Sequence, residues 1–189
     1  MRHFNLKSKV RLLFALAASL LLAGAGTASL PPKEKLFEQF GVTPPRTVKE
    51  APDFTLTTLE GKTVSLKEYE GKPILIHFWA TWCKPCKDEL PTIQKLHEDL
   101  GGDVVHILTI NIDRWNKDRV EEFQRDFGLH FPILLDPKQE VRRKYFIMGL
   151  PTSYLVGADG KLAGYISGPR EWDTPVSHQI MKSLAAKAG

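Results

Sequence analysis

Two cysteines separated by two residues stand between a predicted strand and a predicted helix, in the stretch Trp82-Cys83-Lys84-Pro85-Cys86. Backbone N–H groups at a helix N-terminus are unpaired and stabilise an anion, so this position favours the thiolate of Cys83. Lys84 adds a positive charge, and the thiolate is the form that attacks disulfides. Pro85, at an early helical position, costs no hydrogen bond and stiffens the ring that a disulfide would close. We expect Cys83 to form the mixed disulfide with a partner, and Cys86, one helical turn deeper, to resolve that mixed disulfide.

Other uses of the two cysteines fit this position less well. A structural disulfide across two residues closes almost no loop and therefore stabilises little. A metal site would need two further ligands, and His77 is the only histidine nearby in the sequence. The sequence thus favours a redox-active dithiol, with neither a bound metal nor an organic cofactor.

Strands and helices alternate around this pair. The run 74–80 is almost continuously apolar, which is typical of a strand buried on both faces. Alternating segments over 53–57 and 63–66 predict an N-terminal hairpin, and an Asp-Gly turn predicts a closing hairpin. The remaining expected elements are strands over 104–112 and 131–135 and helices over 83–100, 117–127, 138–146 and 174–187. We therefore expect an α/β domain with a central mixed sheet flanked by helices.

The first 29 residues have the order of an export signal. A basic stretch precedes an apolar run of leucine and alanine, and small residues follow. The uncharged segment also suffices to span a bilayer, so we expect a signal peptide or an N-terminal membrane anchor over 1–29. Residues 30–49, with four prolines, predict a linker with one short helical turn over 33–40. The folded domain is expected over 50–189, in the periplasm or otherwise outside the cytoplasm, soluble after signal cleavage or anchored.

The charge gives no indication of a nucleic-acid partner. The net charge of the 189 residues is +4, and the leader alone carries four basic side chains and no acid. Removing those four leaves 22 Lys and Arg against 22 Asp and Glu. The basic balance therefore comes from the leader. A small basic cluster between Lys138 and Lys144 is expected to be a solvated helix face.

Several motifs together resemble a known family. The stretch FWATWCKPC, Pro91, and Gly-Leu-Pro-Thr at 149–152 resemble the thioredoxin-like fold over about residues 50–189. More narrowly, the chain is similar to the exported TlpA/ResA-type thiol–disulfide oxidoreductases, which have an N-terminal hairpin and a central strand–helix insertion. The resemblance implies disulfide exchange with the thiols and disulfides of exported proteins, as a reductase, with cytochrome c biogenesis as one setting. It also implies a membrane electron donor.

The resemblance extends to residues around the dithiol. It implies that Pro151 follows a cis peptide bond and lies against the cysteines. Partner polypeptides are then expected to contact Leu150 and Pro151 on one side of the dithiol. On the other side, the expected contacts are Trp82, Lys84 and Pro85.

Two titratable residues stand near the cysteines. Glu89 follows Cys86 by three residues on the same helix face and matches an acid of the TlpA/ResA-type reductases. We expect it to be partly buried, with a raised pKa, and to accept the proton of Cys86; a solvated first-turn glutamate is the alternative. His77 occupies the position where cytoplasmic thioredoxins have a buried aspartate. It is expected to be a neutral core residue, with proton relay as the alternative.

Two other functions are known on this fold. A thiol peroxidase needs threonine and arginine beside its cysteine and no second cysteine two residues on; Thr81 is near, but no arginine is. A copper-delivery protein would use both cysteines and a histidine, and such relatives prefer a wider cysteine spacing. Both stay as alternatives to disulfide exchange.

Overall fold

The structure is a computed structural model, which describes residues 32–114 and 117–185. The expected signal or anchor segment, residues 1–29, lies outside the described residues. Within the described ranges, none of the helices combines the length and apolar character that crossing a bilayer requires.

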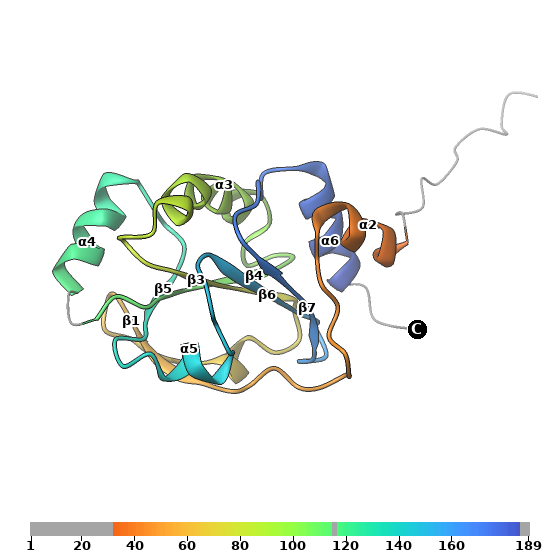
Figure 1. The fold of residues 1–189 in the computed structure, drawn as a ribbon, viewed down its shortest axis with the longest axis horizontal. Coiled ribbons are helices and arrows are strands. Elements are labelled where there is room, and N and C mark those ends of the chain that lie inside the picture. The colour runs from red at the N-terminus through yellow and green to blue at the C-terminus, as the bar shows by residue number, and fades with distance from the viewer. Residues whose placement is uncertain (1–31, 115–116, 186–189) are drawn as a thin grey trace, which may run out of the picture. The chain divides into compact units, whose positions relative to one another are not determined.

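Seven strands form one mixed sheet in the order β2-β1-β5-β4-β3-β6-β7 (Figure 1). Their bounds are β1 Thr55–Thr58, β2 Thr63–Ser65, β3 Ile74–Trp79, β4 His106–Asn111, β5 Ile133–Leu135, β6 Thr152–Val156 and β7 Leu162–Ser167. β3 pairs in parallel with β4 and antiparallel with β6, and β1 pairs antiparallel with β2 and β5. Both expected hairpins and the buried central strand are confirmed.

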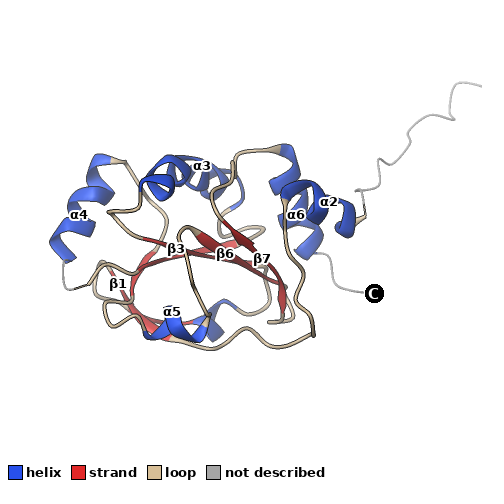
Figure 2. Ribbon diagram, viewed as in Figure 1, coloured by secondary structure: helices blue, strands red, loops and turns tan. Residues whose placement is uncertain are grey.

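Helices cover both faces of this sheet. Their bounds are α2 Lys33–Phe40, α3 Lys84–Leu100, α4 Lys117–Asp126, α5 Glu140–Lys144 and α6 Pro175–Ala185, with a 3-10 turn, η2, over Leu66–Tyr69. α3 and α4 lie on one side of the sheet and α5 on the other (Figure 2). α3 continues through Pro91, as expected.

The central strand determines where the cysteines lie. All six residues of β3 are buried, because strands on both edges and helices on both faces cover its apolar side chains. The chain leaves β3 at Trp79, turns through 80–82 and enters α3 with Cys83 as the N-cap. The cysteine pair is therefore placed at the carboxyl end of a strand that is fixed on every side.

The segment expected as a linker packs against the rest of the domain. Leu36, Phe37 and Phe40 of α2 are buried, and α2 packs against α6. Beyond this helix, Thr43 pairs with Tyr165 of β7 through two backbone hydrogen bonds of 2.8 and 2.9 Å. The compact domain thus includes α2, because apolar residues on one face of this short helix gain burial against α6.

α5 is shorter than the expected helix over 138–146. Gln139 has a left-handed backbone (φ 55°), so the helix begins after it, and Phe146 (φ 53°) follows its end. The buried Asp136 carboxylate accepts backbone N–H groups of Glu140 and Arg142 at 2.8 Å each, which satisfies the first turn.

Candidate active site

Cys83 and Cys86 are joined by a disulfide, with their Cα atoms 5.3 Å apart. Cys83 is the N-cap of α3, and its Sγ accepts a hydrogen bond of 3.2 Å from the backbone N–H of Cys86. Cys83 is 6% exposed and Cys86 is fully buried. The expected difference in burial is confirmed: Cys86 is the less exposed of the two cysteines.

The turn before the cysteines is held by a buried carboxylate. Thr81 donates its backbone N–H (2.9 Å) and its hydroxyl (3.2 Å) to Asp113. The Asn111 side-chain amide donates to the same carboxylate at 2.7 Å, from the end of β4. Asp113 therefore fixes the approach of the chain to Cys83, although 30 positions separate the two residues in the sequence.

The residues beside the disulfide differ in exposure. Trp82 is 61% exposed, whereas Trp79 is buried and packs against Phe123 at 5.2 Å between ring centroids. Lys84 is exposed and pairs with Asp88 at 2.9 Å, one turn along α3. The charge that Lys84 brings to Cys83 is thus partly balanced, an effect that the sequence analysis did not anticipate.

Glu89 is buried, 2% exposed, on the turn of α3 that follows Cys86. Its Oε1 accepts hydrogen bonds from the Trp172 indole N–H and from the Arg170 backbone N–H (3.3 Å). Its Oε2 has no hydrogen-bond partner among the described residues. Burial raises the pKa of Glu89 to about 7, although the Trp172 and Arg170 hydrogen bonds act in the opposite direction. A carboxyl group with this pKa and one unpaired oxygen can exchange a proton near neutral pH.

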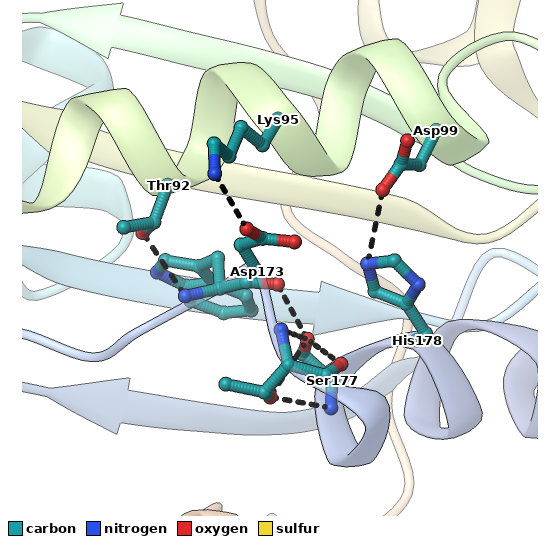
Figure 3. Close-up of polar contacts among 8 residues, drawn as sticks. Thr92, Lys95, Asp99, Asp173, Ser177 and His178 are labelled. Carbon is teal, nitrogen blue, oxygen red and sulfur yellow. Dashed lines mark hydrogen bonds and ion pairs between the residues drawn. The ribbon is translucent and has the colours of Figure 1, made fainter.

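The segment that covers Glu89 is attached to α3 by a row of polar contacts (Figure 3). Thr92 accepts the backbone N–H of Trp172 at 3.0 Å and donates to the Glu89 carbonyl at 2.8 Å. Further along α3, Lys95 pairs with Asp173 at 3.1 Å. The ring of Trp172 packs edge-on against Phe40 at 5.1 Å. These contacts position the indole over the carboxylate.

One group among the described residues has donor atoms close enough to hold a metal ion. It consists of Asp99, Asp173 and His178, whose ligand atoms lie within 4.8 Å of one another. Asp173 is already paired with Lys95, and His178 lies 3.7 Å from Asp99 (Figure 3). These polar side chains extend the contact between α3 and the segment that leads into α6.

The loop before β6 carries the expected cis proline. The Leu150–Pro151 peptide bond is cis, as the resemblance implied. Pro151 is buried, Leu150 is half-buried, and the Pro151 carbonyl accepts the Gly168 N–H at 3.0 Å. Two large apolar side chains just upstream are exposed, Phe146 at 79% and Met148 at 92%.

His77 is a buried residue of β3. Its Nδ1 lies 2.9 Å from the Ser153 hydroxyl on the neighbouring β6, and its Nε2 has no hydrogen-bond partner within the described chain. Burial lowers the pKa of His77 to about 3, so the ring is neutral at physiological pH. This arrangement agrees with the expected neutral core residue.

The sequence analysis missed the residues that surround Glu89. Trp172 and Arg170 lie 83 and 81 positions beyond Glu89 in the chain, so no local pattern connects them. Asp113 was likewise missed. The sequence did contain a signal for the exposed apolar residues Phe146 and Met148. They alternate along the chain with the buried residues Tyr145 and Ile147, so the four cannot all point into the core.

Comparisons with known proteins agree with this geometry. Residues 47–165 match the AhpC/TSA family. The chain is 38% identical over 165 residues to "Thiol-disulfide oxidoreductase ResA" of Bacillus thuringiensis (strain Al Hakam), covering 85% of this chain and 90% of that one. Among solved structures, it is similar to a putative thiol:disulfide interchange protein DsbE from Chlorobium tepidum, with a TM-score of 0.66, 28% identity and coverage of 73% and 96%. It is also similar to StoA from Bacillus subtilis, with a TM-score of 0.59, 33% identity and coverage of 69% and 95%.

Proposed function

The chain belongs to the AhpC/TSA family and is a thiol–disulfide oxidoreductase with a thioredoxin-like fold, and from this premise we propose that it reduces disulfides of exported proteins. The observation that carries the proposed direction is Glu89: a buried carboxyl with an unpaired oxygen, one helical turn beyond the buried Cys86. A reductase must deprotonate its buried resolving thiol, and Glu89 supplies a base for that step.

The proposed reaction has two exchange steps. The Cys83 thiolate attacks one sulfur of the partner disulfide, so that a bond from Cys83 to the partner forms and the first partner sulfur leaves as a thiolate. Glu89 then accepts the proton of Cys86, whose sulfur attacks the Cys83 sulfur. The Cys83–Cys86 bond forms and the second partner sulfur leaves. Two electrons pass to the partner. The resulting Cys83–Cys86 disulfide is then reduced back to the dithiol by a reductant, which we propose to be a membrane electron donor.

The environment of Cys83 supports the same direction. Its sulfur accepts one backbone N–H at the start of α3, which stabilises the thiolate. Strong stabilisation of the thiolate would make the disulfide oxidising. Because Asp88 pairs with Lys84 at 2.9 Å, that stabilisation is limited, which favours a reducing role.

Partner polypeptides are proposed to bind across the cysteines and the loop before β6. Trp82 is exposed on one side, and Leu150 is half-buried on the other. Lys84 and Pro85 are exposed at the start of α3. Exposed aromatic and aliphatic side chains at such a surface provide apolar contact area for a partner.

The cellular setting follows from the leader. We propose that residues 1–29 direct export and that residues 50–189 act outside the cytoplasm, either released or held by the N-terminal segment. Among exported partners that require reduced cysteines, proteins of cytochrome c biogenesis are the proposed class.

Trapping with Cys86→Ala tests the function. Without the resolving sulfur, the mixed disulfide between Cys83 and its partner should accumulate in the native compartment and identify the substrate. Cys83→Ala is the matched control, because it removes the attacking sulfur and should trap nothing. The absence of mixed disulfides, together with no reduction of insulin by the wild-type dithiol, would contradict the proposal.

A further inference from the structure

A pocket of about 340 Å³ opens beside the exposed tryptophan of the active site. Its lining residues are Trp82, Ile112, Asp113, Arg114, Arg119 and Gln139. Trp82 directly precedes Cys83 in the chain, so one wall of the pocket is the residue next to the cysteine that is proposed to meet the partner. The residues come from the turn before α3, the end of β4, the start of α4 and the residue before α5.

The pocket has a positive character. Arg114 and Arg119 line it. Arg142 of α5 donates a hydrogen bond to Gln139, which also lines the pocket. The Gln139 Oε1 accepts a hydrogen bond of 3.4 Å from Arg114 and one of 2.8 Å from Arg142. Within the described residues, no carboxylate lies within ion-pair distance of Arg114 or Arg142. Two guanidinium groups thus share one neutral acceptor, and neither of them makes an ion pair among the described residues.

The lining contains one carboxylate, Asp113, against two arginines, and the oxygens of this carboxylate accept hydrogen bonds from neutral groups. Both Asp113 oxygens accept hydrogen bonds from Thr81, and one also accepts the Asn111 amide. The nearest other buried acid, Asp136, accepts backbone N–H groups of α5. Neither carboxylate is paired with Arg114, which is exposed at the pocket.

Gln139 holds the arrangement in place. It is buried, and its Nε2 donates to the Ile112 carbonyl at 3.1 Å, which ties α5 to the end of β4. Its backbone is left-handed (φ 55°), a conformation that is uncommon outside glycine and costs free energy. The Gln139 side chain, which accepts hydrogen bonds from Arg114 and Arg142, is therefore fixed by its own contact with the end of β4.

We propose that this pocket binds an acidic side chain of the partner polypeptide, close in sequence to the cysteine that Cys83 attacks. The inference rests on the proposed function and specifies its substrate class. A carboxylate is complementary to the guanidinium of Arg114, and Arg–carboxylate pairs are geometrically specific. Because an extended chain advances roughly 3.3 Å per residue, an acidic residue about two positions from the partner cysteine can reach a pocket that borders Trp82.

The test compares three disulfide peptides with capped termini. They are identical except at the position two residues from the cysteine, which is Glu, Gln or Lys. The measured quantity is the second-order rate constant for their reduction by the wild-type dithiol. The Glu peptide should react about three- to tenfold faster than the Gln peptide at low salt, and the Lys peptide more slowly. High salt should remove most of the difference, because the site is exposed.

Variants assign the effect to the pocket. Arg114→Gln should abolish the preference for the Glu peptide, and Arg114→Glu should reverse it toward the Lys peptide. Arg143→Gln is the matched control: this residue is exposed on the same helix as Arg142 but contacts the Lys138 carbonyl and does not line the pocket. It should keep the preference.

The outcomes separate the two proposals. If the wild type reduces all three peptides at equal rates, or if Arg114→Gln retains the preference, the pocket proposal is refuted while the reductase stands. If the wild type reduces none of them, including the Gln peptide, the proposed function itself fails.

Discussion

Replacing Glu89 with Gln should stabilise the oxidised protein at alkaline pH and leave it nearly unchanged in acid. Glu89 is buried and its pKa is raised from the ordinary 4.5 to about 7. Between these values, the folded protein binds more protons than the unfolded chain, so its stability falls as pH rises. This loss of stability is complete above pH 7. Glu89→Gln abolishes the loss, because the amide side chain does not ionise.

The magnitude follows from the shift. A Glu89 pKa of 4.5 in the unfolded chain and about 7 in the folded protein lowers the free energy of unfolding of the wild type by about 3 kcal/mol at pH 8 and by about 1 kcal/mol at pH 5. The free energy of unfolding of Glu89→Gln, relative to wild type, should therefore rise by about 2 kcal/mol between pH 5 and pH 8. Urea unfolding of the oxidised proteins measures it, and in this state the cysteines do not titrate.

The same substitution at Glu122 provides the control, since this glutamate is exposed on α4. The difference in the free energy of unfolding between this control variant and the wild type should stay constant within about 0.5 kcal/mol across the pH range. A second measurement follows the resolving step: Glu89→Gln should slow attack by Cys86 about a hundredfold at pH 7. A pH-independent stability difference at Glu89, or an unchanged resolving rate over pH 5–9, would refute the reasoning.

Two further predictions concern the neighbours of this site. Trp172→Phe removes the indole N–H that favours the ionised carboxylate, so the pKa of Glu89 should rise further, measured as an alkaline shift in the pH profile of the resolving step. Phe40→Leu, which keeps that N–H, should leave the profile in place. Burial lowers the pKa of His77 from 6.5 to about 3, so the unfolded chain binds more protons below pH 6.5 and wild-type stability falls as pH decreases. The free energy of unfolding of His77→Gln should therefore gain about 2 kcal/mol relative to wild type between pH 8 and pH 5, measured by urea unfolding. A constant difference would contradict the lowered pKa, because it would show that the folded ring takes up a proton as readily as the unfolded one.

The chemistry of the cysteines was predictable because it depends on local features. The spacing of Cys83 and Cys86, the proline between them and the apolar run of β3 specify a dithiol at a helix start within some 15 residues of sequence. Helix periodicity also places Glu89 one turn beyond Cys86. The order of strands and helices followed from the same short-range patterns, and boundaries differed mainly at α5, which lies between the left-handed residues Gln139 and Phe146.

The environment of Glu89 was decided by the tertiary structure. Whether that glutamate is solvated or buried depends on Trp172 and Arg170, which reach it from more than 80 positions away. The packing of α2 and the arginines around Gln139 have the same origin. Hydrophobic periodicity reports which face of an element is buried, but not which distant segment covers it. For this chain, local sequence determined which atoms can react, and long-range packing set the pKa of the carboxyl group one helical turn beyond them.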